Sequence, residues 1–181
     1  MNEGLIPKRY AKALFLVAKE RKEEKDIYMS MKCVEASFVS MPQLNDTLNN
    51  PYVSVADKAA LILTAAGVSQ KSGLFADFIA LLSDNKRLGF IRLIACAYMD
   101  IYRMANNIFK VDVASAAPLE KSVEARLKKL ISRHLGDGTM EYSHSINPSL
   151  IGGFTVSVGN ERIDASVRNE LKQLRLNLIS K

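Results

Sequence analysis

The sequence has little of the chemistry on which metal and catalytic sites depend. Its 181 residues include two cysteines, two histidines and no tryptophan. Cys33 and Cys96 lie 63 positions apart in apolar helical patterns, a spacing that excludes a redox or zinc motif and predicts buried free thiols. His134 and His144 have no cysteine or carboxylate at ligand spacing. We therefore expect no metal site, and we find no nucleophile or acid–base pair for catalysis.

Nucleotide-binding loops, membrane spans and export signals are missing as well. Gly152-Gly153 and Gly159 are not followed by a GK[ST] motif, so they are interpreted as turn glycines and no cofactor is expected. Arg92 and Asp100 interrupt the longest apolar candidate well before the roughly 18 residues of a membrane span. The first residues, MNEGLIPKRYAKALF, include an acid and no cleavable apolar core. We expect a cytoplasmic protein without a transit peptide.

The sequence also lacks a concentrated block of charge of one sign. The net charge is +6, but residues 1–107 carry 14 basic and 11 acidic side chains, and residues 108–181 carry 11 and 8. An even +3 on each part is typical of a mixed surface. A basic two-domain nucleic-acid-binding protein remains as the alternative function, supported by net charge alone.

The first 105 residues are dominated by helical periodicity. Breakers and capping residues divide them into six segments: about 7–21, 27–40, a short turn or helix to 49, 54–66, 69–84 and 88–105, the last expected to be the longest. Ser54 is the predicted N-cap of the fourth segment and Ser69 that of the fifth. Short links between such segments favour an all-helical bundle over residues 1–105.

Two of these helices have unusually wide apolar surfaces. In the first, apolar side chains cover about 200° of the helical wheel, where a helix on a core needs little more than about 100°. They are Tyr10, Ala11, Ala13, Leu14, Phe15, Val17 and Ala18. In the fifth, six large residues lie within about 160°: Leu74, Phe75, Phe78, Ile79, Leu81 and Leu82. For the first helix there are two explanations: it is central in the bundle, which is the interpretation we favour from the pattern, or it leaves a strip free for a partner helix.

After residue 105 the period changes from helical to alternating. Strand patterns cover about 108–114 and 140–146, and an amphipathic helix, about 119–135, lies between them. A hairpin follows, in which a turn at Gly159-Asn160 pairs Val156 with Ile163. Residues 106–181 are therefore predicted to form a small α+β domain of order β-α-β-β-β-α. The overall fold class is mainly α, a six-helix bundle followed by this α+β domain.

The end of the chain is predicted to pack on that sheet. Asp164 fits as the N-cap of the last helix, accepting hydrogen bonds from the amides of Ser166 and Val167. Apolar residues then recur at helical spacing and form a face expected to lie on the sheet; they are Val167, Leu171, Leu174 and Leu178.

Two stretches together resemble a known family. They are YAKALFLVAKE (10–20) and LIGGFTVSVGNERIDASVRNEL (150–171), and LNNPYVSVADKAALI, LLSDNKRLGFI and VASAAPLE follow in the same order between them. The chain is similar over its whole length to the delta subunits of F-type ATP synthase, the family of the mitochondrial oligomycin-sensitivity-conferring protein. The C-terminal stretch is the more specific of the two.

The resemblance implies a non-catalytic connector of the peripheral stalk (stator). Its helical bundle is expected to bind the N-terminal helix of an ATP synthase alpha subunit, and its C-terminal domain is expected to bind the b subunit. Such a protein lies peripherally at the cytoplasmic face of the bacterial inner membrane and reaches the membrane only through its complex. No nucleic acid and no cofactor are implied.

The resemblance also assigns candidate binding residues. The family's groove lies between the first and fifth helices, here Tyr10–Lys19 and Lys71–Asp84. We expect eight residues to divide between core and groove: Tyr10, Ala11, Ala13, Leu14, Leu74, Phe78, Ile79 and Leu82. Leu176 and Ile179 lie off the apolar face of the last helix and are predicted to contact b. An enzyme is the remaining functional class, and a polar pocket would distinguish it.

Overall fold

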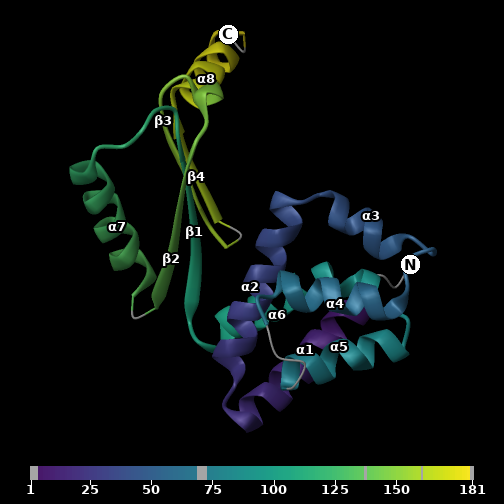
Figure 1. Cartoon of the computed structure of the whole chain (residues 1–181). Helices are drawn as coiled ribbons and strands as arrows, with labels where there is room; N and C mark the ends of the chain where they lie inside the picture. Colours follow the sequence, from purple (N-terminus) through teal and green to yellow (C-terminus); the bar gives the residue numbers. More distant parts are fainter. Residues whose placement is uncertain (1–3, 69–72, 137, 160, 180–181) are drawn as a thin grey trace. The chain divides into compact units, whose positions relative to one another are not determined.

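The structure is a computed structural model that describes residues 4–68, 73–136, 138–159 and 161–179 (Figure 1). It divides into two compact units, Met1–Tyr102 and Arg103–Lys181. The boundary predicted from the sequence, after residue 105, lies three residues beyond this division. The predicted cap Ser69, the expected helix start Lys71 and the turn residue Asn160 lie outside the described residues.

Within the described residues, six α-helices precede the first strand. They are α1 (Leu5–Arg21), α2 (Glu24–Ser40), α3 (Gln43–Asn49), α4 (Val55–Ala65), α5 (Leu74–Asp84) and α6 (Ile91–Ala105), with a 3-10 turn, η1 (Leu88–Phe90), before the last. The predicted cap of α4 is confirmed, because the amide of Asp57 donates to Ser54 Oγ over 3.1 Å. The segment from residue 88 is not the longest, since its first turn is 3-10 and α1 and α2 each have 17 residues.

The core of the first unit is built from aliphatic and aromatic side chains of its helices. The rings of Phe15 and Tyr98 meet edge to face at 6.0 Å, and those of Tyr28 and Tyr102 stack at 4.3 Å. Tyr98 donates its hydroxyl hydrogen to the carbonyl of Glu24 over 3.1 Å. Burial, with Glu24 and Tyr102 nearby, raises the pKa of Tyr98 well above its ordinary value, so the phenol stays a neutral donor.

The expectation of buried thiols is wrong for both cysteines. Cys33 is exposed on α2, and Cys96 is half-buried on α6. Apolar residues at helical spacing around a cysteine indicate an amphipathic helix, but they do not determine on which side of it the cysteine lies.

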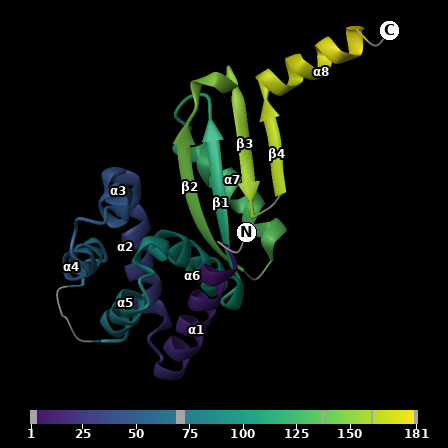
Figure 2. The same ribbon diagram turned by 90° about the vertical axis from the view of Figure 1, so that its right-hand side faces the viewer.

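The second unit confirms the predicted element order β-α-β-β-β-α. Its elements are β1 (Ile108–Ser115), α7 (Lys121–Leu135), β2 (Thr139–Ile146), β3 (Gly153–Val158), β4 (Glu161–Ser166) and α8 (Val167–Ile179). The strands form one sheet in the order β2-β1-β3-β4 (Figure 2). β1 and β2 are parallel and joined through α7, as a parallel pair requires, and the other pairs are antiparallel. Val156 pairs with Ile163, as predicted.

One face of this sheet carries the core of the unit. Val111, Val113 and Val156 are buried with Ile131 of α7, and Leu127 of the same helix packs against them. The alternate residues of β1 point to the opposite face, and they include Lys110 and Asp112. The sheet therefore has a single apolar face, and α7 covers its buried core.

The prediction that α8 packs on the sheet is wrong. None of its residues is buried, and the face of four residues from Val167 to Leu178 is exposed. In both views α8 runs beyond the end of the strands (Figures 1 and 2). The core of the apolar face is occupied by α7 and the other face is polar, and α8 lies on neither of them.

The predicted cap of α8 is also displaced by two residues. Asp164 belongs to β4, and its carboxylate accepts from the amide and the hydroxyl of Ser166. Ser166 Oγ in turn accepts from the amide of Asn169 over 3.2 Å and caps the helix. The amide of Val167 donates instead to the carbonyl of Gly152.

Candidate partner-binding groove

Helices α1 and α5 enclose an apolar groove of about 410 Å³ in the first unit. The groove is lined by Arg9, Tyr10, Ala13, Leu14, Val17, Leu74, Asp77, Phe78 and Leu81. Seven of these nine side chains are apolar or aromatic, and the two charged ones come one from each helix. The arrangement suits the apolar face of another helix.

The wide apolar arc of α1 divides into two stripes. Ala11, Leu14, Phe15 and Ala18 are buried among the unit's own helices. Ala13 and Val17 are exposed and line the groove, as does the half-buried Tyr10. The interpretation that the whole arc is buried is therefore wrong for the second stripe.

The apolar stripe of α5 divides in the same way. Leu74 and Phe78 are largely buried, but both line the groove. Ile79 and Leu82 are buried in the core and do not line it. Leu81 lines the groove and is 49% exposed.

Five of the eight predicted groove-or-core residues therefore line the groove. They are Tyr10, Ala13, Leu14, Leu74 and Phe78. Ala11, Ile79 and Leu82 do not line it and are buried in the core. Sequence reasoning did not assign Arg9, Val17, Asp77 or Leu81 to the groove, although the apolar arcs of α1 and α5 already contained Val17 and Leu81.

Aromatic side chains form one wall of the groove. The ring of Tyr10 meets that of Phe78 edge to face, with centroids 6.4 Å apart and an interplanar angle of 64°. Arg87, which follows the end of α5, donates from Nη1 to the hydroxyl of Tyr10 over 2.8 Å. Its guanidinium carbon lies 5.4 Å from the centroid of the same ring, within the range of a cation–π contact.

A second apolar surface lies on α8. Leu176 is 52% exposed and Ile179 is 70% exposed, so both predicted b-contact residues are accessible. Leu171, Leu174 and Leu178 of the same helix are exposed as well. Several large apolar side chains left exposed on one helix make it a candidate interaction surface.

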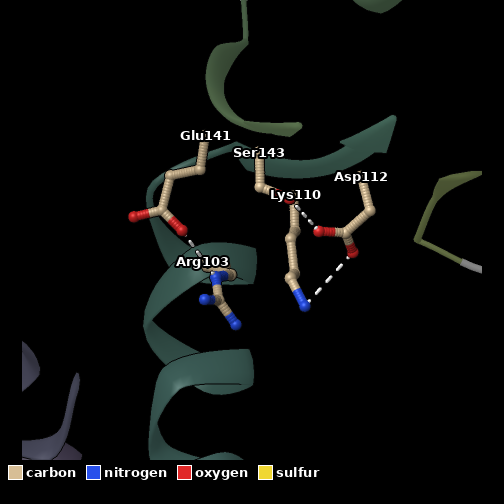
Figure 3. A network of polar contacts seen from close by, with 5 residues as sticks. All are labelled: Arg103, Lys110, Asp112, Glu141 and Ser143. Carbon is tan, nitrogen blue, oxygen red and sulfur yellow. Dashed lines mark hydrogen bonds and ion pairs between the residues drawn. The ribbon is translucent and has the colours of Figure 1, made fainter. Parts of the chain in front are cut away.

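The polar face of β1 and β2 carries a network of polar contacts, in which a hydrogen bond between Ser143 and Asp112 joins the two strands (Figure 3). Ser143 donates to Asp112 over 2.5 Å, and Lys110 lies 3.2 Å from the same carboxylate. Burial alone would raise the pKa of Asp112, but the bonds from Ser143 and Lys110 outweigh it and hold that pKa below its ordinary value. Arg103 pairs with Glu141 over 3.0 Å. The lowered pKa of Asp112 keeps this carboxylate ionised near neutral pH, which is unsuited to proton transfer.

His144 has a structural partner. Its Nε2 lies 2.7 Å from Ser115 Oγ, and that hydroxyl donates its own hydrogen to the carbonyl of Ala117 over 2.6 Å. Ser115 must therefore accept from His144, so Nε2 carries the hydrogen of this bond. Ser115 is buried and already bonded, which gives it no access to a substrate.

No group of three or more His, Cys, Asp or Glu side chains that could hold a metal ion occurs among the described residues. Over the same part of the chain, no helix has the length and apolar character that crossing a membrane requires.

Comparison with known proteins decides between the remaining interpretations. The family model described as ATP synthase delta (OSCP) subunit matches residues 6–178. The chain belongs to the ATP synthase delta (OSCP) family. It is 38% identical over 179 residues to the ATP synthase subunit delta of Parabacteroides distasonis, covering 99% of this chain and 98% of that protein. It is 36% identical over 182 residues to that of Bacteroides thetaiotaomicron, covering 100% and 97%.

A solved structure shows the same fold. A chain in the cryo-EM structure of the Toxoplasma gondii mitochondrial ATP synthase hexamer matches with a TM-score of 0.73 and 23% identity, covering 96% of this chain and 97% of that chain. As a delta/OSCP subunit, the protein is a non-catalytic part of the peripheral stalk of the F-type ATP synthase. Its association with the membrane is indirect. The comparisons do not support the nucleic-acid alternative.

Proposed function

We propose that this stalk subunit holds the N-terminal helix of an ATP synthase alpha subunit in the groove between α1 and α5, and contacts the b subunit through α8. In this proposal α1–α6 act as one six-helix bundle, residues 1–105, and residues 106–181 form the b-binding domain. The observation that carries the proposal is the apolar groove on the two helices to which the family resemblance assigns the alpha site.

The chemistry of the groove favours a helix as its occupant. Val17 and Leu81 are large apolar residues that remain 38% and 49% exposed, so a partner has apolar surface left to cover. Ala13 lies in the groove and is small, which lets a helix approach α1 closely. Each 100 Å² of apolar area covered would contribute about 2.5 kcal/mol before the costs of association.

Titration calorimetry with a peptide of the alpha N-terminus tests the groove. Ala13→Glu places a carboxylate in the apolar groove at an exposed position of α1, outside the buried stripe of that helix, and we expect it to abolish measurable binding. Ala36→Glu is the matched control, because Ala36 is an exposed alanine within α2 and does not line the groove. Unchanged affinity in Ala13→Glu, with wild-type thermal stability in both variants, would place the alpha site elsewhere.

Photo-crosslinking tests the second contact. A crosslinker at Leu176 of α8 should label the b subunit in the assembled complex, and one at Val123 of α7 serves as an exposed apolar control. Labelling of alpha alone from position 176 would count against a b-binding α8. A crosslink to b from position 123 but not from position 176 would indicate that b contacts α7 and not α8.

We further propose that the protein works at the cytoplasmic face of a bacterial inner membrane and is retained there through its complex. Support comes from the relatives in Parabacteroides and Bacteroides species and from the absence of a spanning helix in the described residues. When membranes are washed at low ionic strength, the protein should be released only if its contacts with other stalk subunits are broken. Retention on protein-free lipid vesicles would contradict an indirect attachment.

A further inference from the structure

We propose that Arg87 is a positioning residue that holds the ring of Tyr10 as a fixed wall of the α1–α5 groove, so that the groove is formed before a partner binds. Arg87 is not itself among the residues that line the groove. It acts through Tyr10, which does line the groove. The effect on binding rests on the proposed function, whereas the effect on Tyr10 does not.

The end of α5 determines where Arg87 lies. Lys86 has a left-handed backbone, with φ of 55°, and its amide donates to the carbonyl of Ser83 over 3.0 Å. The amide of Arg87 donates to the carbonyl of Leu82 over 2.8 Å. These two bonds are those of a Schellman motif, which ends a helix and turns the chain back over it. The backbone that carries Arg87 is therefore fixed to α5.

From this position one guanidinium makes two different contacts with Tyr10. It donates to the hydroxyl over 2.8 Å, and its central carbon lies 5.4 Å from the centroid of the ring. The edge-to-face contact with Phe78 limits the ring on another side. Tyr10 is thus restrained by side chains that α5 and its C-terminal turn position, although Tyr10 belongs to α1.

This restraint matters because Tyr10 is only half-buried. A large side chain that is free to rotate loses that freedom when a partner covers it, and the loss weakens binding. A ring already held by Arg87 avoids most of that loss. A lysine could supply the charge, but its ammonium lacks the rigid planar fork of donors from which the guanidinium makes both contacts.

The first test is the affinity of the full-length protein for the alpha N-terminal peptide. We expect Arg87→Ala to bind about fivefold more weakly, equivalent to about 1 kcal/mol at 1.4 kcal/mol per factor of ten. Arg92→Ala is the matched control, because Arg92 lies over the ring of Phe38 at 5.9 Å in the same unit and neither residue lines the groove. Its affinity should equal that of the wild type.

A double-mutant cycle separates positioning from general stability. If Arg87 acts through Tyr10, its loss should weaken binding less in a Tyr10→Phe background, which already lacks the hydroxyl. If the losses of peptide affinity caused by the two substitutions simply add in the double variant, the proposal is overturned. If Arg87→Ala does not fold, Arg87→Lys takes its place in the cycle, with a smaller loss expected.

The second test needs no partner. Aromatic NMR of the free protein should show contacts between the ring protons of Tyr10 and Phe78, and Arg87→Ala should weaken them while Arg92→Ala leaves them intact. Undiminished ring contacts in folded Arg87→Ala would overturn the proposal. Weakened ring contacts in Arg87→Ala together with unchanged peptide affinity would also overturn it. If the wild-type protein does not bind the peptide at all, the proposed alpha site fails, and the ring contacts still decide whether Arg87 positions Tyr10.

Discussion

Truncation of Leu81 gives the sharpest measure of what the groove contributes to binding. Leu81 lines the groove from α5 and keeps 49% of its surface exposed in the free protein. Burying a whole leucine side chain is favourable by about 1.5–3 kcal/mol, so covering the remaining half is worth about 1 kcal/mol. We expect Leu81→Ala to raise the Kd for an alpha N-terminal peptide about fivefold.

Leu93 offers a control with the same starting exposure. It lies on α6, is also 49% exposed, and does not line the groove. Leu81→Ala and Leu93→Ala remove the same atoms from helical positions with the same exposed fraction, so their effects on unfolding free energy should be similar. Only Leu81→Ala should change the Kd. Titration calorimetry measures the affinities, and urea unfolding followed by circular dichroism measures the stabilities.

Two results would refute the reasoning. If both variants weaken binding equally, the effect comes from general destabilisation and not from the groove. If Leu81→Ala binds as the wild type does, the partner does not cover the exposed half of Leu81, and the groove between α1 and α5 is not its site. A loss much larger than about tenfold would show that the partner also depends on Leu81 to keep the groove in shape.

Three further outcomes follow from particular contacts. Ser54→Ala removes the N-cap of α4 and should destabilise the first unit by about 1 kcal/mol, seen as a melting midpoint lower by several degrees. Lys86→Gly relieves a left-handed backbone and should raise the stability of that unit by up to about 1 kcal/mol without changing peptide affinity. The pKa of Asp112 is held below its ordinary value, so its contribution to stability is present at neutral pH and is lost as the pH falls through that lowered pKa; urea unfolding between pH 7 and pH 3 should show a shallower decline in Asp112→Asn.

Local signals predicted most of the element order. Ser54 with Asp57 three residues later determined the start of α4, and the change of period after residue 105 predicted β1. The pairing of Val156 with Ile163 followed from the turn at Gly159, whose φ is 56°. Each of these signals depends on neighbours within a few residues, so it can be recognised without knowing the fold.

The position of α8 could not be found in this way, because it depends on what else covers the sheet. The spacing of Leu171, Leu174 and Leu178 correctly indicates an amphipathic helix, but not the surface against which it lies. The sheet has one apolar face, and the side chains of α7 that surround Ile131 occupy it. An amphipathic pattern was visible for α7 as well, and choosing between the two helices required the three-dimensional arrangement.

The same limit explains why core and groove could not be separated on α1. Ala11 and Leu14 are apolar because the unit's own helices cover them, and Ala13 and Val17 are apolar because, on our proposal, another subunit does. Both reasons produce the same residue types, so the sequence shows only their sum, an arc of about 200°. The surplus over the roughly 100° that a core requires was the informative quantity. Burial in the free protein and burial in the complex use the same physical interaction, and a helix that serves both must be apolar over more of its surface than either alone would need.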